Sequence, residues 1–184
     1  ANPFGYVSPT SAEHVERTLG SKIKAILDGG SCAIGLESTI VDLRDPEQPV
    51  ILRHGPITAS QIENCLGFPA RTKLAEKNDD HAAQSAPGQL TKHYSPKARV
   101  ELLEHGSISL KDSIISHLNS KTALVCNQKP EWYRGQPSVY WLSETGNPDE
   151  MARNLFALIQ KLDRQQFQRI HIERAPSRGL GQAI

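Results

Sequence analysis

The chain has 184 residues, of which 38% are hydrophobic and 22% charged, and its formal net charge is +1. This balance is typical of a soluble globular protein with a core, organised as one domain or two small ones. The chain carries 9 basic and 11 acidic residues before Pro96, and 12 basic and 9 acidic residues from Pro96 onward. Neither part has the basic excess of a protein that binds mainly through phosphate contacts, so nucleic acid is disfavoured as the main partner.

Three well-separated cysteines, Cys32, Cys65 and Cys126, form no CxxC pair, so the sequence supports neither a zinc site nor a disulfide framework. Cys32 and Cys126 lie in apolar runs and are predicted to be reduced core residues. No apolar run approaches the roughly 20 residues that cross a bilayer, and no secretory signal opens the chain. We therefore expect a cytoplasmic protein that does not contact a membrane.

The first predicted elements are two helices. Thr10 and Glu13 have the spacing of a capping box, which predicts a helix over 11–19. Apolar residues at helical spacing predict a second, short helix over 23–27, ended by a Gly-Gly pair.

A hairpin and a third helix follow. Residues 32–43 read as a long strand and residues 50–54 as its partner, joined by an Asp-Pro turn. Ser38 falls on the face of the long strand that is otherwise apolar, and a buried hydroxyl needs a partner from the protein or from a ligand. A helix capped by Thr58 or Ser60 is predicted to run to about Cys65.

Some thirty residues from Leu66 to Pro96 are polar and rich in proline and glycine, and this predicts a domain boundary. Strands and helices then alternate, which implies a small, mostly parallel sheet and an α/β class. The predicted elements are a strand at 98–104, a helix at 108–119, strands at 122–126 and 138–142, a helix at 148–162 and a strand at 168–173. One face of the last helix is predicted to be apolar, with Met151, Leu155, Leu158, Ile159 and Leu162.

Few residues suggest chemistry by themselves. Arg53 ends a strand, where it either reaches the rim of the sheet or pairs with an anion, and Gly55 lets a ligand or another backbone come close. Ser8 precedes a helix N-terminus, which favours anions. The closing Gly179-Leu180-Gly181 reads as a helix-entry turn rather than a dinucleotide loop, and no HExxH or GxSxG motif supports a hydrolase.

The order of four motifs is more specific than any one of them. The runs ANPFGYVSPTSAEHV, LESTIVDL, ILRHGPIT and APGQLTKHYSP resemble the YrdC-like threonylcarbamoyl-AMP synthases in their longer, two-domain form. The resemblance covers almost the whole chain and is firmest from Ala1 to Pro96. It implies the C-terminal part of a YrdC-like twisted-sheet α/β domain at 1–66, a linker or lid at 67–96, and a small Rossmann-like α/β domain at 97–184.

By this resemblance the protein is a nucleotidyltransferase that condenses L-threonine, bicarbonate and ATP, with Mg²⁺, to threonylcarbamoyl-AMP and pyrophosphate. The product serves the threonylcarbamoyl modification of an adenosine in tRNA. The implied partner is therefore a tRNA threonylcarbamoyl transferase complex, and tRNA itself is a weaker candidate.

The resemblance also implies the site. It assigns ATP contacts to Asn2, Ser8, Arg53 and Tyr94, and the contact with threonine to Ser38. Gly88 and His93 belong to a lid that closes over the nucleotide. It implies no covalent nucleophile and no protein ligand for a metal.

The basic Lys-x-Arg motif of the family does not occur at the start of this chain, so we expect this chain to be the C-terminal half of a catalytic domain with its linker and second domain, and to be inactive alone. Two other functions are compatible with this fold class. A carbamoyl-adenylate activity in hydrogenase maturation would require a zinc-finger or acylphosphatase segment. A double-stranded RNA-binding module would require more positive charge.

Overall fold

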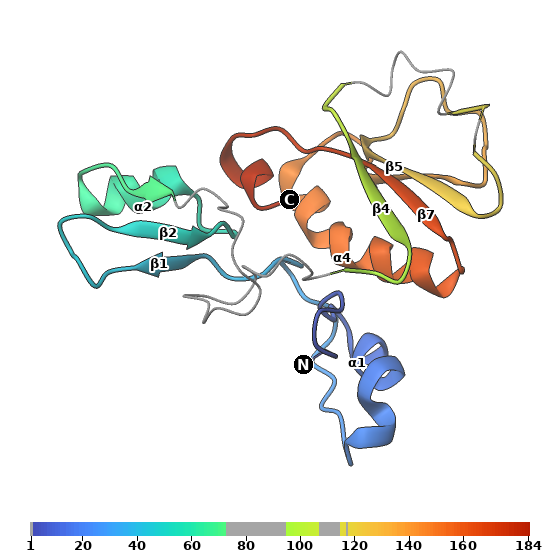
Figure 1. Cartoon of the computed structure of the whole chain (residues 1–184), viewed down its shortest axis with the longest axis horizontal. Helices are drawn as coiled ribbons and strands as arrows, with labels where there is room; N and C mark the ends of the chain where they lie inside the picture. The colour runs from blue at the N-terminus through green and yellow to red at the C-terminus, as the bar shows by residue number, and fades with distance from the viewer. Residues whose placement is uncertain (1, 73–94, 107–114, 117) are drawn as a thin grey trace.

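A computed structural model describes residues 2–72, 95–106, 115–116 and 118–184. It contains two β-sheets with helices, so the predicted α/β class is confirmed (Figure 1). Within the described residues, the first sheet has three strands and the second has four. In the part of the chain that the structure describes, no helix is long and apolar enough to cross a membrane.

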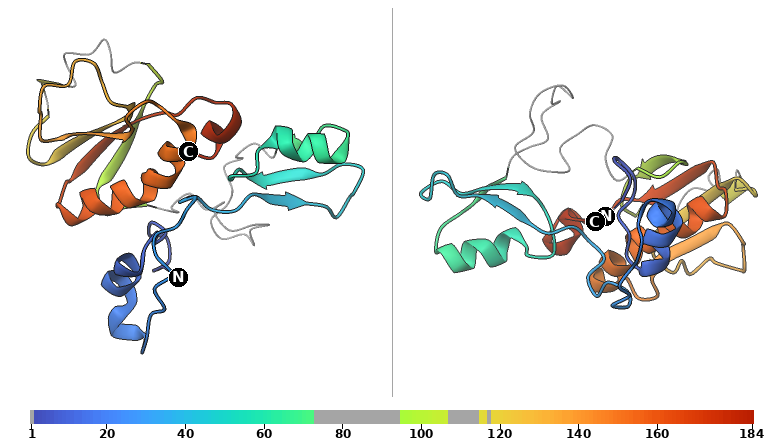
Figure 2. Two further views of the ribbon diagram at one scale, coloured as in Figure 1. Left: turned by 180° about the vertical axis from the view of Figure 1, so that it is seen from behind. Right: turned by 90° about the horizontal axis from the view of Figure 1, so that it is seen from below.

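The first helix is α1, at Ala12–Leu19, as predicted. Its cap is Ser11 rather than Thr10, because the Ser11 hydroxyl accepts the hydrogen bond from the backbone N–H of His14. The second predicted helix is wrong: the chain continues into a single 3₁₀ turn, η1, at Gly20–Lys22, and residues 23–27 are irregular. Seen from behind, α1 lies below the long helix of the second sheet (Figure 2).

The first sheet is small. Strand β1 at Ile40–Asp42 pairs antiparallel with β2 at Val50–Arg53, as the hairpin pattern predicts, and β3 at Arg71–Thr72 pairs parallel with β2. Helix α2 at Ala59–Leu66 begins with a complete capping box between Thr58 and Gln61 and ends at Gly67, whose positive φ closes the helix. This helix, too, agrees with the prediction.

The long strand predicted over residues 32–43 is wrong over its first two thirds, because only residues 40–42 pair with a neighbouring strand. Within this stretch, Gly35 lies against the long helix of the second sheet, and Leu36 packs against the core beside that helix. A Cβ atom at Gly35 would lie 2.6 Å from the Cα of Arg153. Apolar alternation alone does not make a strand, since a strand also needs a partner for its backbone hydrogen bonds.

The second sheet agrees with the predicted order of elements. Its four strands are β4 at Arg99–Leu103, β5 at Thr122–Gln128, β6 at Val139–Ser143 and β7 at Arg169–Glu173. They pair in the order β4-β7-β5-β6, and every pairing is parallel. Most of the helix predicted over 108–119 lies outside the described residues. The chain ends in a 3₁₀ turn, η3, at Gly179–Gln182, where a helix-entry turn was predicted.

The core of the molecule lies on the two faces of this second sheet. Helix α4 at Pro148–Arg164, capped by Asn147, covers one face. Four of the five residues predicted for its apolar face are buried, and Leu158 packs against the same core. The other face holds a smaller cluster that includes Cys126, whose burial raises the pKa of its thiol to about 12. Cys126 is therefore a core residue as predicted, whereas Cys32 is exposed.

Candidate functional site

The segment from Asn2 to Ser8 is a tight turn held by its own first residue. The Asn2 side-chain amide donates to the carbonyl of Tyr6 at 2.8 Å, and the backbone N–H of Tyr6 donates to the carbonyl of Pro3 at 3.0 Å. Gly5 adopts a φ of 74°, which only glycine reaches without strain. Asn2 therefore shapes the segment that carries Ser8.

Ser8 contacts the stretch that precedes β1. Its hydroxyl donates to Glu37 Oε1 at 2.5 Å, across 29 residues of sequence. The carboxylate of Glu37 also lies 3.9 Å from the Arg53 guanidinium. Glu37 thus joins a serine near the start of the chain to an arginine at the end of β2.

Arg53 turns toward the 37–39 stretch rather than toward the rim of the sheet. Its Nε donates to the carbonyl of Ser38 at 2.9 Å, and one terminal nitrogen donates to the Ser38 hydroxyl at 3.0 Å. The Arg53 side chain is only 15% exposed. The guanidinium is thereby fixed in one orientation, with its planar fork beside a hydroxyl.

Close backbone contact holds this arrangement. A Cβ atom at Gly55 would lie 2.6 Å from the Glu37 carbonyl oxygen, so only glycine allows the two stretches to approach. The Thr39 hydroxyl donates to the carbonyl of Ile57 at 2.7 Å and accepts from its N–H at 3.1 Å. The close approach predicted at Gly55 is made by another backbone.

The structure therefore brings three of the predicted residues, Ser8, Ser38 and Arg53, into one chain of contacts through Glu37. Ser38 is exposed rather than buried, contrary to the strand-based prediction, because residues 32–39 do not form a strand. The predicted lid residues, Gly88, His93 and Tyr94, lie outside the described residues. Sequence reasoning missed Glu37, although a carboxylate between Leu36 and Ser38 in an apolar run was a signal.

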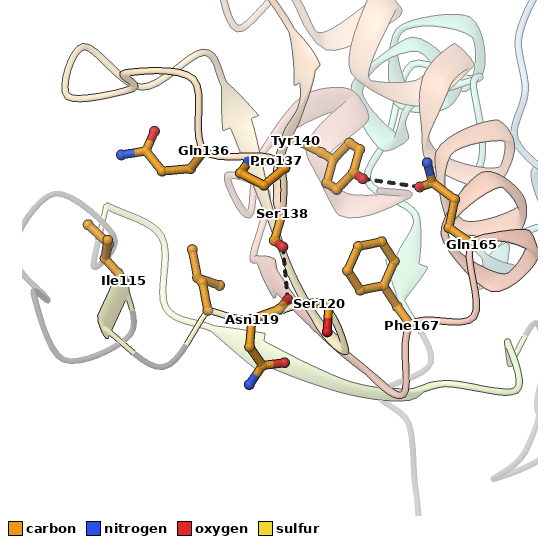
Figure 3. Close-up of a pocket in the computed structure, with 10 residues that line it drawn as sticks. Ile115, Asn119, Ser120, Gln136, Pro137, Ser138, Tyr140, Gln165 and Phe167 are labelled. Carbon is orange, nitrogen blue, oxygen red and sulfur yellow. Dashed lines mark hydrogen bonds between the residues drawn. The ribbon is translucent and has the colours of Figure 1, made fainter.

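Two of the cavities beside the second sheet lie at opposite ends of its strands. One, of about 490 Å³, lies where β5 and β6 begin, and Tyr140, Gln165 and Ser138 line it (Figure 3). None of the predicted site residues lines it. The other, of about 550 Å³, lies at the opposite, carboxyl-terminal edge of the strands, where Glu173 accepts the backbone N–H groups of Gly106 and Asn127 at 2.9 Å.

Comparison with known families assigns nearly the whole chain. Residues 57–184 match the family described as "Threonylcarbamoyl-AMP synthase, C-terminal domain". Residues 1–55 match the family described as "Telomere recombination". The boundary between the two matches falls at the end of the site built by Ser8, Ser38, Arg53 and Gly55.

Curated relatives agree with this. Threonylcarbamoyl-AMP synthases from Schizosaccharomyces pombe, Pyrococcus abyssi and Bacillus subtilis are 35%, 34% and 32% identical to the chain. Each match covers the full chain but only 48%, 54% and 53% of the relative. The chain therefore spans about half the length of the curated relatives it matches.

Solved structures give the same answer. The crystal structure of P. abyssi Sua5 complexed with L-threonine matches 99% of the chain and 53% of the solved chain, with a TM-score of 0.81 and 30% identity. A variant of the same protein with a histidine and the next tyrosine changed to alanine matches 99% of this chain and 52% of the solved one, with a TM-score of 0.80 and 31% identity. The chain belongs to the Sua5/YrdC family of threonylcarbamoyl-AMP synthases.

Proposed function

We propose that this chain supplies part of the active site of an L-threonylcarbamoyladenylate synthase. The observation that carries the proposal is the contact chain Ser8–Glu37–Arg53–Ser38, which joins the residues expected at ATP to the residue expected at threonine. A synthase that couples the two substrates needs both subsites within one arrangement. The relative with threonine bound, whose fold this chain shares, supports an amino-acid subsite.

The reaction joins three substrates. The amine of threonine attacks carbon dioxide or bicarbonate to form a carbamate, with loss of water when bicarbonate is the source. A carbamate oxygen then attacks the α-phosphate of ATP, and pyrophosphate leaves. This displacement depends on positioning and positive charge rather than on a covalent nucleophile.

In this reaction Arg53 would offer its guanidinium to the phosphates, in the orientation that its bonds to Ser38 already fix. The Ser38 hydroxyl would turn to threonine, and the Ser8 hydroxyl to the nucleotide. Asn2 would act on the same segment as Ser8. Mg²⁺ would arrive with ATP, as part of the nucleotide substrate.

The linker would complete the site. His93-Tyr94 is the one His-Tyr pair of the sequence, and a His-Tyr pair is the one replaced in the P. abyssi variant. We infer that Tyr94, next to His93 and a few residues after Gly88, reaches the nucleotide and excludes water from it. The implied recipient of the product is a tRNA threonylcarbamoyl transferase complex.

The test uses the full-length product of the reading frame that encodes this chain, incubated with ATP, Mg²⁺, threonine and bicarbonate. Threonylcarbamoyl-AMP is measured by mass spectrometry. Arg53→Ala is expected to lower kcat/KM about a hundredfold, the size of effect seen when one electrostatic donor is removed from an active site. The matched control is Arg44→Ala, since the Arg44 side chain is 83% exposed and pairs with Asp42.

Tyr94→Ala tests the lid in the same assay, and a sharp loss of product is expected. Unchanged product would leave the synthase in place and reduce the HYSP stretch to a linker. No product from a folded full-length protein would overturn the proposed function and leave the RNA-binding alternative to be tested by the salt dependence of its affinity.

A further inference from the structure

Helix α4 contains a buried polar side chain that the apolar pattern of its face does not explain. Gln160 is 1% exposed and lies among Phe156, Ile159 and Leu162. Burying an amide costs free energy unless its hydrogen bonds are made. An apolar residue would fill the same space, so the partners of Gln160 show what the amide is for.

Those partners all lie in the N-terminal part of the chain. Gln160 Nε2 donates to the carbonyl of Ser8 at 3.0 Å and to that of Val7 at 3.4 Å. Its Oε1 accepts from the Arg17 guanidinium of α1. Gln160 therefore binds the backbone of residues 7 and 8, which lie more than 150 residues earlier in the sequence.

Three residues further along α4, Asp163 makes a second set of contacts. It accepts the Tyr6 hydroxyl at 2.9 Å and the backbone N–H groups of Lys97 at 3.0 Å and Ala98 at 3.2 Å. Burial, and to a smaller extent the hydrogen bond to Asp163, raises the pKa of Tyr6 to about 12. The hydroxyl therefore stays protonated and donates. Lys97 and Ala98 come directly after the predicted lid.

The two sets of contacts bring the start of the chain and the end of the lid together. Tyr6 and Ser95 form a parallel bridge, and the N–H of Ser95 donates to the carbonyl of Gly5 at 2.9 Å. Asp163 then binds the side chain of Tyr6 and the backbone that follows Ser95. The Ser8 segment and residues 95–98, at the end of the predicted lid, are thus fixed against a single turn of α4.

Ser8 connects these contacts to the candidate site. Its carbonyl accepts from Gln160, and its hydroxyl donates to Glu37, which lies beside Arg53 and hence Ser38. Ser8 is therefore bound through its carbonyl to α4 and through its hydroxyl to the stretch that precedes β1. Coupling between two sites requires a continuous path of contacts, and this path is present here. Substitutions along the path would measure how strongly the sites are coupled.

We propose that Gln160 and Asp163 form a clasp, here the α4 clasp, that positions the Ser8 segment for the nucleotide and ties it to the exit of the lid. This rests on the proposed function. Both are positioning residues, since they act through Ser8, Tyr6 and the backbone at 97–98. Helix α4, which covers the second sheet, would thereby help to position the active site.

Two variants of the full-length protein test the clasp. Gln160→Met keeps the length and bulk of the side chain and removes its hydrogen bonds, and Tyr6→Phe removes one hydroxyl. Each is expected to raise KM for ATP about tenfold or more, because small misplacements of a binding group have effects of this order. Gln165→Met is the matched control, since Gln165 ends the same helix and accepts from Tyr140. It is expected to leave KM within twofold.

The change in KM for ATP relative to the change in kcat separates a positioning role from a stabilising one. A variant that only loses folded molecules has a lower kcat with an unchanged KM for ATP, whereas a misplaced Ser8 segment raises KM. If Gln160 acts through Ser8, adding Gln160→Met to Ser8→Ala is expected to change KM little further. Unchanged KM in a folded Gln160→Met or Tyr6→Phe protein would overturn the clasp, and if Gln160→Met does not fold, Tyr6→Phe decides alone.

Direct ATP binding, measured by calorimetry, keeps this proposal separate from the proposed function. A wild-type protein that binds ATP but makes no threonylcarbamoyl-AMP would overturn the synthase, while weaker ATP binding by Tyr6→Phe would still support the clasp. Equal ATP binding by wild type, Gln160→Met and Tyr6→Phe would overturn the clasp, whether or not product forms.

Discussion

The two sheets of this protein are stabilised in different ways. In the second sheet the central strand β5 is buried on both faces, and Leu124, Leu142 and Ile170 are at most 1% exposed, whereas the edge strand β4 leaves Leu102 58% exposed. In the first sheet and the loops beside it, Leu43 and Ile57 are 58% and 57% exposed. There the chain is held by the hydroxyl of Thr39, the guanidinium of Arg53 and the close approach at Gly55.

This difference indicates that the second sheet mainly provides stability and the first sheet mainly orients the candidate site. Apolar burial stabilises the second sheet, and it is non-directional, so it holds a scaffold without selecting a ligand. Hydrogen bonds and close backbone contacts are directional, and they orient Ser8, Arg53 and Ser38. Substitutions in the second sheet should therefore affect stability first, and those around the first sheet should affect activity first.

The largest expected difference is between two isoleucines. Ile170→Ala removes a fully buried side chain from the core under α4, and it is expected to lower the free energy of unfolding by about 2–5 kcal/mol. Ile57→Ala is the matched substitution at a residue that is 57% exposed, and its cost is expected to stay within about 0.5 kcal/mol. Urea unfolding of the 184-residue chain measures both, and equal costs would contradict the comparison.

Gly55→Ala tests whether close backbone contact beside the first sheet is needed for activity. An added methyl group would collide with the backbone of residues 37–39 and displace Ser38 and Glu37. Activity of the full-length protein is expected to fall about a hundredfold, since a displacement near 1 Å has effects of this size. Gly29→Ala is the control, because a Cβ atom there meets nothing within 4 Å. Full activity of Gly55→Ala would show that the close approach is not needed.

The smallest expected effect is a dependence of stability on pH. Burial lowers the pKa of His171, which lies between Glu101 and Arg169, and burial with Arg17 lowers the pKa of His14. The unfolded chain then binds more protons, so stability is complete above about pH 6.5 and falls as the pH drops below it. Unfolding measured from pH 8 to pH 5 checks this.

His171→Gln and His14→Gln are each expected to flatten that dependence, the first through β7 and the second through α1. A stability that rises as the pH falls, or the same slope in both variants as in wild type, would contradict the assignment.

Elements with strong local signals could be predicted from the sequence. Helix α4 was predicted because the spacing of its apolar residues acts within the helix itself. The cap of α2 at Thr58 is equally local. The family resemblance, carried by four ordered motifs, also came from the sequence, and the family is confirmed by the comparisons.

The sequence by itself therefore determined the α/β class, the succession of strands and helices along the second half of the chain, and the family, because short-range spacing encodes them. Only the tertiary structure decided that residues 32–39 form no strand and that Gly35 lies against α4, since a strand depends on a neighbouring strand that pairs with its backbone. It also decided the partners of Gln160 and Asp163, at separations of 152 and 157 residues from Ser8 and Tyr6. Contacts at such separations depend on how whole elements pack, and no local pattern of residues encodes that packing.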